Sequence, residues 1–558
     1  MTPAESVPLR RRIADATFVI GIWLLSLAVF FREFVFSGFS RIQIRGGDSD
    51  IAYVVAEHWY QWLSGSAEWR SPAFFFPVQG TLGYTDTQFL YVPPYAILRW
   101  MGVDMFIALQ LVVMFLTSIG YFSMYLLLRR HLKVRVLLAA AASVAFAFSN
   151  ALALKQFHVN TFGIEFVPLI VLLAAESVAA IRSRRRTRSI AFAAAAGLLW
   201  ALLFFTSFYM AWFLGLALMA LVAVLLLVDR DLILAGVRWL RSNPRRWLRE
   251  AAGFVSGFAI GIIPSLTIYL PVISESGGRT FGEVLALSPR PSDIFNLGRD
   301  NLLWGRITWP GTTPLEGVER SLAVPPLLVV SSIAGLVILW FVRSRVSDNR
   351  RLRFLTGLAV TAAAITLVSW RFGDWSMWKM IWKVVPGGKA IRAVDRVQFV
   401  MALFWAIVWA GTMNELWSRL SVTKRKAGSL GIGFIILLSG LVMLEQVNLN
   451  SIKGFDHTDR SRYFASIPKP PEECLSFYAI DPREKYVGDQ LQMQAMLVSI
   501  QVGLPTVNGL SGMTPPGWDL WSPSDPTYPD VVQRWAETNG IAEGLCQLDF
   551  SNKKWSAV

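Results

Sequence analysis

The sequence predicts a polytopic α-helical membrane protein that carries a small α/β domain at its C-terminal end. Hydrophobic residues make up 54% of the 558 residues, and charged residues only 16%, whereas about a quarter is usual for soluble domains. Apolar runs long enough to cross a hydrocarbon core of about 30 Å recur along most of the chain. These observations exclude a cytosolic enzyme, a disordered chain and a secreted disulfide scaffold.

About eleven runs are apolar for the roughly 17 to 25 residues that a membrane-spanning helix needs. They cover 16–36, 105–128, 133–149, 162–181, 189–206, 209–228, 251–271, 322–342, 354–370, 396–418 and 429–447. The apolar run 88–100 is too short to span and contains Pro93-Pro94, so we expect a re-entrant or interfacial piece there. The run at 16–36 is too long for a cleaved signal sequence and predicts a retained first helix.

Basic residues orient the predicted bundle. About half of the 53 Lys and Arg residues fall in the N-terminal segment and in five short connections, at 129–135, 182–188, 229–250, 343–353 and 419–428. Cytoplasmic loops are enriched in Lys and Arg, so these segments and the N-terminus are predicted to be cytoplasmic, in a bacterial inner membrane. The net charge of +15 is therefore a topology signal and an attraction to the lipid bilayer, with no nucleic-acid partner implied.

The alternation of apolar runs and basic connections predicts a membrane module over 1–450 and an exported domain over 451–558. Within the membrane module, the exported segments are expected at 37–104, 271–321 and 371–395. Within that domain, 474–480 and 544–550 read as strands, and 489–503 and 531–540 as helices. Both cysteines, Cys474 and Cys546, fall in this domain. A disulfide is favoured over a metal pair because an exported compartment is oxidising.

The sharpest polar cluster is Gly46-Gly47-Asp48-Ser49-Asp50, directly after the first predicted span. It precedes 51–64, where apolar residues at helical spacing and several tryptophans predict an amphipathic interfacial helix. One acid would suffice to cap that helix. Two acids at positions i and i+2 behind a glycine pair favour a catalytic or metal-binding role for Asp48 and Asp50.

Two further clusters contain candidate substrate-binding residues. The exported segment before residue 396 holds the cations Arg371, Lys379, Lys383, Lys389, Arg392 and Arg396. Of these, Arg392 and Arg396 are preferred as phosphate ligands, since a guanidinium group can bind phosphate in a bidentate manner. The alternative is that the cations lie beside lipid headgroups. The end of the third span supplies Lys155, Gln156, His158 and Glu165 as residues that could line the same site, and Asp86 is a second acid that could instead form a turn.

This arrangement resembles the GT-C superfamily, integral membrane glycosyltransferases that use polyprenyl-phosphate sugars. The resemblance lies in the acid motif after the first helix and in the multi-span bundle, and two segments look like those of bacterial members: FSNALALKQFHVNTFGIEFVPL (148–169) and GGKAIRAVDRVQF (387–399). It implies a GT-C-like fold. It also implies that Asp50 or Asp48 acts as the catalytic base or helps to hold a divalent metal, Mg²⁺ or Mn²⁺.

The leading prediction is therefore a glycosyltransferase, of hexosyl or pentosyl type, that moves a sugar from a polyprenyl-phosphate donor to an extracytoplasmic acceptor. Such a transfer needs a carboxylate near the acceptor hydroxyl and fixed positive charge on the phosphate. Two alternatives stay open at this point. One is a lipid or solute transporter or flippase, and the other is a non-catalytic subunit of a surface-glycan assembly complex.

Overall fold

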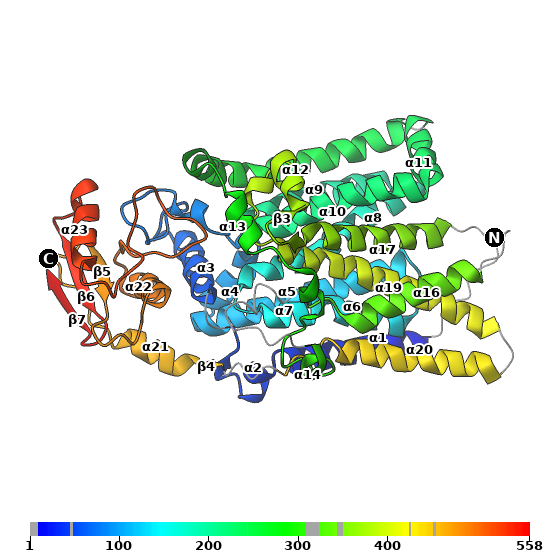
Figure 1. Cartoon of the computed structure of the whole chain (residues 1–558), viewed down its shortest axis with the longest axis horizontal. Helices are drawn as coiled ribbons and strands as arrows, with labels where there is room; N and C mark the ends of the chain where they lie inside the picture. The colour runs from blue at the N-terminus through cyan, green and yellow to red at the C-terminus, as the bar shows by residue number, and fades with distance from the viewer. Residues whose placement is uncertain are drawn as a thin grey trace.

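The structure is a computed structural model that describes residues 9–44, 48–242, 244–308, 323–342, 350–422, 426–449 and 454–557. Gly46 and Gly47 of the acid motif lie outside the described residues. Figure 1 shows a long bundle of helices with the C-terminal α/β region at one end and the N-terminus at the other.

Nine of the described helices are long and apolar enough to cross a membrane, judged by length and composition. They are α1 (Leu9–Phe30), α5 (Met105–Arg130), α6 with α7 (Val136–Ala147 and Asn150–Leu154), η3 with α8 (Val159–Phe166 and Val167–Arg182), α9 (Arg186–Thr206), α10 (Phe208–Val228), α12 (Pro244–Ser276), α17 (Arg350–Ser369) and η6 with α19 (Val394–Val397 and Gln398–Val422). Two shorter apolar helices, α16 (Pro326–Phe341) and α20 (Lys426–Leu444), lie at the other predicted spans. The prediction of a polytopic helical protein with about eleven spans is confirmed.

Small residues let neighbouring helices pack closely where they cross. A Cβ atom at Gly197 of α9 would lie 2.1 Å from the carbonyl oxygen of Phe254 on α12, and one at Gly257 would lie 2.2 Å from that of Ala194. Backbones can approach this closely only where side chains are absent, which is a general means of helix association in lipid. α19 is the central helix, since 94% of the residues in the most apolar stretch of η6 and α19 are buried.

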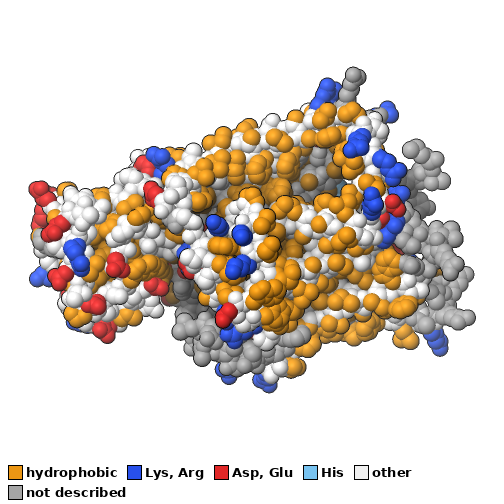
Figure 2. Space-filling view, turned by 45° about the horizontal axis from the view of Figure 1, so that its top comes forward, with side chains coloured by type: hydrophobic (Ala, Val, Ile, Leu, Met, Phe, Trp, Pro, Cys, Tyr) orange, Lys and Arg blue, Asp and Glu red, His pale blue; other side chains and the backbone are white. Residues whose placement is uncertain are grey.

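The surface of the bundle is banded by residue type. Figure 2 shows hydrophobic side chains along the flank of the bundle and Lys and Arg side chains gathered at the end away from the C-terminal region. That end includes α11 (Arg230–Ser242), one of the predicted cytoplasmic connections. α11 therefore lies at the end of the bundle where basic side chains gather, as the charge pattern predicts.

Short helices and strands gather at the opposite end. The helices are α2 (Arg32–Phe36), α3 (Ser49–Leu63), η1 (Thr81–Tyr84), η2 (Phe89–Tyr91), α4 (Val92–Trp100), α13 (Phe281–Ala286), η4 (Pro291–Phe295), α14 (Gly305–Thr308), α18 (Trp378–Val384) and η5 (Gly388–Ala390). Two small antiparallel pairs accompany them. β1 (Arg41–Ile42) pairs with β4 (Phe455–Asp456), and β2 (Arg371–Phe372) pairs with β3 (Trp375–Ser376).

The C-terminal region is a three-stranded sheet with helices around it. β5 (Ser476–Ile480) and β6 (Leu545–Asp549) are parallel, and β7 (Lys554–Ala557) is antiparallel to β6. The helices are α21 (His457–Ala465), α22 (Asp489–Val502) and α23 (Tyr528–Thr538). The predicted order of strand, two helices and strand is found, while α21 and β7 were not predicted.

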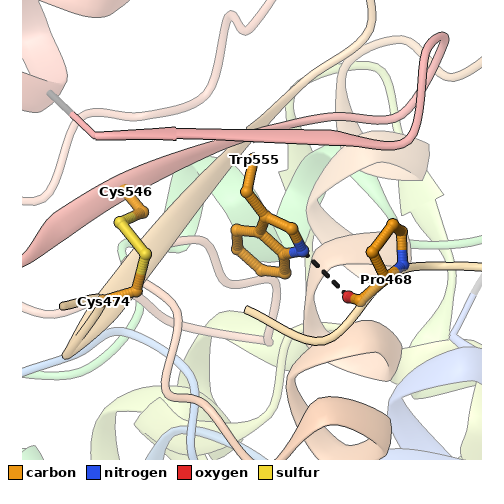
Figure 3. The surroundings of a disulfide bond; sticks show 4 residues. All are labelled: Pro468, Cys474, Cys546 and Trp555. Carbon is orange, nitrogen blue, oxygen red and sulfur yellow. Dashed lines mark hydrogen bonds between the residues drawn. A yellow bond between two sulfur atoms is a disulfide. The ribbon is translucent and has the colours of Figure 1, made fainter. Parts of the chain in front are cut away.

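The predicted disulfide is present. Cys474 and Cys546 are bonded, with their Cα atoms 5.6 Å apart. Figure 3 shows the bond beside Trp555, whose indole nitrogen donates a hydrogen bond of 2.9 Å to the carbonyl oxygen of Pro468. The disulfide therefore connects the segment that precedes β5 with β6, which is the central strand of the sheet.

The C-terminal region is joined to the first long connection of the bundle by backbone hydrogen bonds. The amides of Phe75 and Phe76 donate to Asn508 and Thr506, and the amide of Thr506 donates to Ala73. α3 packs against α22, and eleven consecutive residues of α3 from Ser49 to Trp59 are buried. The helix predicted at 51–64 is confirmed as α3, and most of it is buried within the protein, in part against α22.

Candidate active site

A cavity of about 1030 Å³ lies where the bundle meets the C-terminal region. Its walls include the start of α3, the segment 83–88, the turn between α12 and α13, the segment 382–396 and the loop 510–514, together with Val159, Asn160 and the first turn of α10. Its volume is at the upper end of the range usual for ligand pockets. Of the predicted site residues, it brings together Asp48, Asp86, Lys389, Arg392 and Arg396.

Asp48 stands directly before α3 and faces the cavity. It occupies the N-cap position, yet its side chain makes no capping hydrogen bond to the helix. Instead, His158 Nδ1 lies 2.9 Å from Asp48 Oδ2, and the tautomer with hydrogen on Nδ1 donates to the carboxylate. The carboxylate is 54% exposed and His158 is buried. The helix-capping alternative is therefore not the role that Asp48 has here.

Asp50 has different surroundings from Asp48. Its Oδ2 accepts hydrogen bonds from Arg460 at 2.7 Å and from Gln494 at 3.1 Å, both in the C-terminal region. The Arg460 guanidinium lies over three rings, those of Phe106, Phe455 and Phe464. Asp50 is buried and is not among the described residues that line the cavity. The two acids, expected to share one site, are separated by the start of α3.

Asp86 is the second acid of the cavity wall. It accepts hydrogen bonds from the Asn160 side chain and, at 3.1 Å, from the amide of Phe208 at the first turn of α10. Part of Asp86 faces the cavity, but the packed protein around it leaves the carboxylate poorly hydrated, and this burial raises its pKa. Arg396 lowers the pKa and Asp48 raises it, so both charges act on Asp86.

Several basic side chains line the same cavity. Lys389, Arg392 and Arg396 all line the cavity, together with Lys383 and Arg279. The Arg396 guanidinium lies over the Tyr209 ring at 5.6 Å, and the Lys389 ammonium lies over the Trp382 ring at 5.5 Å. The exposed side chain of Arg392 has no hydrogen bond or ion pair to any residue in the described part of the chain.

The local backbone explains how this basic wall is held. Gly387 has a φ of +80°, a conformation that L side chains rarely adopt, and a Cβ there would lie 2.9 Å from Trp212 Nε1. Trp212 Nε1 donates a 2.8 Å hydrogen bond to the carbonyl oxygen of Pro386, and the amide of Arg392 donates a 2.7 Å hydrogen bond to Tyr209 Oη. α10 therefore anchors the segment 386–392 on both sides of its cations.

The remaining predicted ligands lie elsewhere. Lys155 is buried and paired with Asp395, and Gln156 accepts a 3.0 Å hydrogen bond from Gln43 and lines a second, smaller cavity. Glu165 is buried against Gly120, and neither of its oxygens has a hydrogen-bond partner among the described residues. Arg371 and Lys379, also predicted as phosphate ligands, are not among the described residues that line the cavity.

Several lining residues were missed by the sequence prediction. Arg279 follows the positive-φ pair Gly277-Gly278; its guanidinium pairs with Glu283 and donates to the carbonyl oxygen of Gly512. The loop 510–514 comes from a turn-rich stretch, and no local sequence pattern predicts where that stretch lies in the fold.

Aromatic rings, among them Tyr84 and Trp382, also line the cavity. Burial raises the pKa of Tyr84 to about 12, so its hydroxyl keeps its proton and donates to Glu275 at 3.4 Å.

The predicted metal pair does not fit the geometry. Asp50 Oδ2 is bound by an arginine and an amide, and Asp50 faces away from the cavity that Asp48 lines. Among the described residues there is no group of three or more His, Cys, Asp and Glu side chains that could hold a metal ion. Asp48 and Asp50 are therefore not a shared ligand set for Mg²⁺ or Mn²⁺.

Taken together, carboxylates and cations line the same cavity, and Asp86 is close enough to Arg396 and to Asp48 for both charges to act on it. A carboxylate held by a histidine can accept a proton from a hydroxyl group. Arginine and lysine side chains can stabilise a phosphate that gains charge as a bond to it breaks. The arrangement suits group transfer from a phosphorylated donor to a hydroxyl acceptor.

Solved structures of two proteins show a distant similarity to this chain. One is the arabinofuranosyltransferase AftD from Mycobacteria, with 13% identity, a TM-score of 0.47, and coverage of 92% of this chain and 32% of AftD. The other is ArnT from Cupriavidus metallidurans, in the apo state (12% identity, TM-score 0.36, 88% and 86% coverage) and bound to undecaprenyl phosphate (11%, 0.35, 90% and 86%). The chain thus spans about a third of the length of the AftD chain.

No protein-family model and no curated protein sequence matches the chain. The described helices give the chain the multi-pass helical membrane architecture expected from the sequence.

Proposed function

We propose that the protein transfers a sugar from a polyprenyl-phosphate donor to a hydroxyl group of an extracytoplasmic acceptor, within the cavity that Asp48 lines. The observation that carries this proposal is the shared cavity itself. It is lined by a histidine-bound carboxylate and by five basic side chains among the described residues, at one end of an apolar bundle. The proposed orientation puts this end, with the disulfide-bonded C-terminal region, outside the cell.

In the proposed step, the acceptor oxygen forms a bond to the anomeric carbon of the sugar. The bond from that carbon to the donor phosphate oxygen breaks, and the lipid phosphate leaves with the electron pair. The acceptor hydroxyl gives its proton to Asp48. The charge that develops on the phosphate is stabilised by Arg392 and Arg396, with Lys383 and Lys389 beside them.

Each neighbouring residue has a role in this step. His158 orients the Asp48 carboxylate through its Nδ1 hydrogen bond. Asp86 acts on the same wall, where it is held by Asn160 and by the first turn of α10 and can accept a hydrogen bond from a sugar hydroxyl. The aromatic rings of the wall offer flat faces against which a sugar can pack.

The distribution of charge favours transfer over transport. A transport pathway places ionisable groups near the midplane of the membrane, along a cavity that opens to either side. Glu165, the carboxyl in the membrane part that was predicted as a candidate ligand, packs against Gly120 and lines neither cavity described here. The acids and cations that line the larger cavity lie instead where the bundle meets the C-terminal region.

The test uses the purified protein in lipid nanodiscs with undecaprenyl-phosphate pentose or hexose donors and a bacterial envelope extract as acceptor. Release of undecaprenyl phosphate and transfer of the sugar are followed by mass spectrometry. The wild type is expected to turn over at least one donor, and Asp48→Asn to reduce turnover by about 10²- to 10⁴-fold, as is usual when a general base is lost. Equal turnover by the wild type and Asp48→Asn would contradict the assignment of the base.

A further inference from the structure

A second cavity, of about 320 Å³, opens between helices of the membrane part and is not used by the proposed reaction. α1 and α20 form its sides, and α6 and α7 form its floor. Figure 1 shows α1 and α20 running along the same side of the bundle. We call this cavity the α1–α20 groove.

The lining of the groove changes along its length. On α1, apolar residues from Ile22 to Phe30 line it before Arg32 and Glu33 of α2; on α20 and after it, Gly440 and Met443 precede Gln446 and Asn448. Both sides are therefore apolar at the depth of the membrane and polar at the end near the C-terminal region. Leu25 is 60% exposed, so the apolar part is open to the hydrocarbon of the bilayer.

An unsatisfied hydrogen-bond acceptor lies at the polar end. Gln43 is 6% exposed, and its Nε2 donates to the carbonyl oxygen of Phe30 at 2.7 Å and to Gln156 Oε1 at 3.0 Å. These two bonds fix the orientation of the amide, and its Oε1 accepts no hydrogen bond from any described residue. This oxygen is covered by protein, so a ligand in the groove meets instead the amide side chains that line its mouth, among them Gln156, Gln446 and Asn448. Amides both donate and accept hydrogen bonds, which suits a ligand that carries hydroxyl groups.

The polar end of the groove lies next to the proposed active site. Gln156 lines the groove, while His158 binds Asp48 in the other cavity. The Cα atoms of these two residues are at most about 7 Å apart, because two residues of extended chain reach no further. The segment 156–158 is therefore the partition between the two cavities.

From these observations we propose that the α1–α20 groove binds the acceptor of the reaction, a lipid with a hydroxyl-bearing, uncharged head group. Its hydrocarbon chain lies between α1 and α20, and its head group hydrogen-bonds to the amide side chains at the groove mouth and extends past 156–158 towards Asp48. The inference rests on the proposed function and names the acceptor class. The basic cavity suits the anionic donor, whereas one cation, Arg32, and one anion, Glu33, line the described groove mouth, which has no excess of positive charge.

The experiment uses a photoreactive alkyl glycoside, a single-chain lipid with a sugar head and no phosphate, whose chain carries a diazirine. The full-length protein in phosphatidylcholine nanodiscs is labelled, and the labelled residues are located by mass spectrometry. Labels are expected on residues that line the groove, such as Val29 and Met443. Excess undecaprenyl phosphate is expected not to compete.

Two glycines of α20 provide matched variants. A Cβ added at Gly440 or at Gly433 meets nothing within 4 Å, but of the two only Gly440 lines the groove in the described structure. The series Gly440→Ala, Gly440→Leu and Gly440→Phe is expected to reduce labelling progressively, by at least tenfold for phenylalanine, and to raise the KM for a lipid acceptor. Gly433→Phe is expected to leave both unchanged.

The outcomes separate this inference from the proposed function. Equal labelling of Gly440→Phe and Gly433→Phe, or displacement of the label by undecaprenyl phosphate, would overturn the assignment of the groove. Sugar transfer to lipid that persists unchanged in Gly440→Phe would overturn it as well. Groove labelling without any transfer by the wild type would contradict the proposed function and the acceptor role together. Asp48→Asn is expected to keep the label while losing transfer.

Discussion

Asp48 and Asp50 lie two positions apart in the sequence, but the first turn of α3 points them in different directions. Asp48 meets His158 and an open cavity, while Asp50 meets Arg460 and Gln494 of the C-terminal region. In the proposed reaction Asp48 has the chemical role, and Asp50 holds the start of α3 in position. The two residues can be distinguished because they should fail in different ways.

Asp50→Asn should lower stability while leaving the chemistry of each folded molecule intact. The substitution leaves Arg460, which is 16% exposed, without its charged partner, and breaking a buried ion pair costs about 3 kcal/mol or more. We expect a lower midpoint of thermal unfolding for Asp50→Asn and an unchanged midpoint for Asp48→Asn, which is half-exposed. The opposite order, with Asp48→Asn the less stable variant, would contradict the assignment.

Asp86 gives a pH dependence whose sign follows from its surroundings. Burial raises its pKa above the usual 3.8, so the folded protein binds this proton more tightly than the unfolded chain does. Its contribution to stability therefore falls as the pH rises from about 3.8 through the raised pKa, and then levels off. The size of the fall is about 1.4 kcal/mol for each unit by which the pKa is raised.

The measurement is the unfolding midpoint of the wild type and Asp86→Asn across this pH range. The wild type should lose stability relative to the variant as the pH increases, and the difference should become constant at high pH. A difference that grows in favour of the wild type with increasing pH would mean that the pKa of Asp86 is lowered instead.

The role of an individual residue was predictable where its charge and its position next to a predicted span were sufficient to indicate that role. Asp48, Asp86, Lys389, Arg392 and Arg396 were named from charge and position, and all five line the cavity. Lys155 was misjudged because its partner, Asp395, is 240 positions away and neutralises it inside the bundle. Such pairings depend on tertiary structure, which periodicity does not report.

The same limit applies to two short helices near the cavity. The pattern of 51–64 predicted its helix correctly, but an apolar face covered by α22 looks the same in the sequence as one covered by lipid. Pro93 and Pro94 were expected to interrupt 88–100. They instead begin α4 at its first turn, where proline is tolerated because the missing amide hydrogens have no partner there.

α18 offers a matched pair of cations for testing the phosphate wall. Lys383 lines the cavity, whereas Lys379, one turn earlier, lies over the Phe281 ring and is not among the described lining residues. Since Lys383 is exposed, its contribution to phosphate binding is expected to be about 1 kcal/mol at most. Lys383→Ala should raise the KM for the donor about three- to fivefold, and Lys379→Ala should leave it unchanged.

Steady-state kinetics at several ionic strengths would check this prediction. The difference between the two variants should shrink as salt is added, because exposed charges are screened. Equal KM values at low salt would show that α18 does not face the donor phosphate.

At the scale of the chain, the membrane part was predictable because hydrocarbon imposes a strict length and composition on every span. All eleven predicted runs correspond to described apolar helices. The cavity was not predictable as a whole, because the C-terminal loop 510–514 closes it from more than 100 residues beyond the nearest basic wall residue, Arg396. The joining hydrogen bonds between 73–76 and 506–508 are likewise long-range.

The disulfide should stabilise this closing region. Cys474 and Cys546 are 72 positions apart, and closing a loop of that length removes enough unfolded-state entropy to contribute about 4 kcal/mol. The double variant Cys474→Ala with Cys546→Ala should unfold its C-terminal region at a lower temperature, measured by limited proteolysis during heating. The bundle helices should melt as before, and equal protease resistance in both proteins would contradict this role.

The central claim is that the basic cavity beside Asp48 holds the phosphate of a lipid donor. The most direct measurement is an experimental structure of the protein in nanodiscs with undecaprenyl phosphate. The phosphate is expected between Arg392 and Arg396, opposite Asp48, with the prenyl chain leaving towards the membrane. A phosphate bound in the α1–α20 groove, or outside the wall formed by 383–396, would contradict the account.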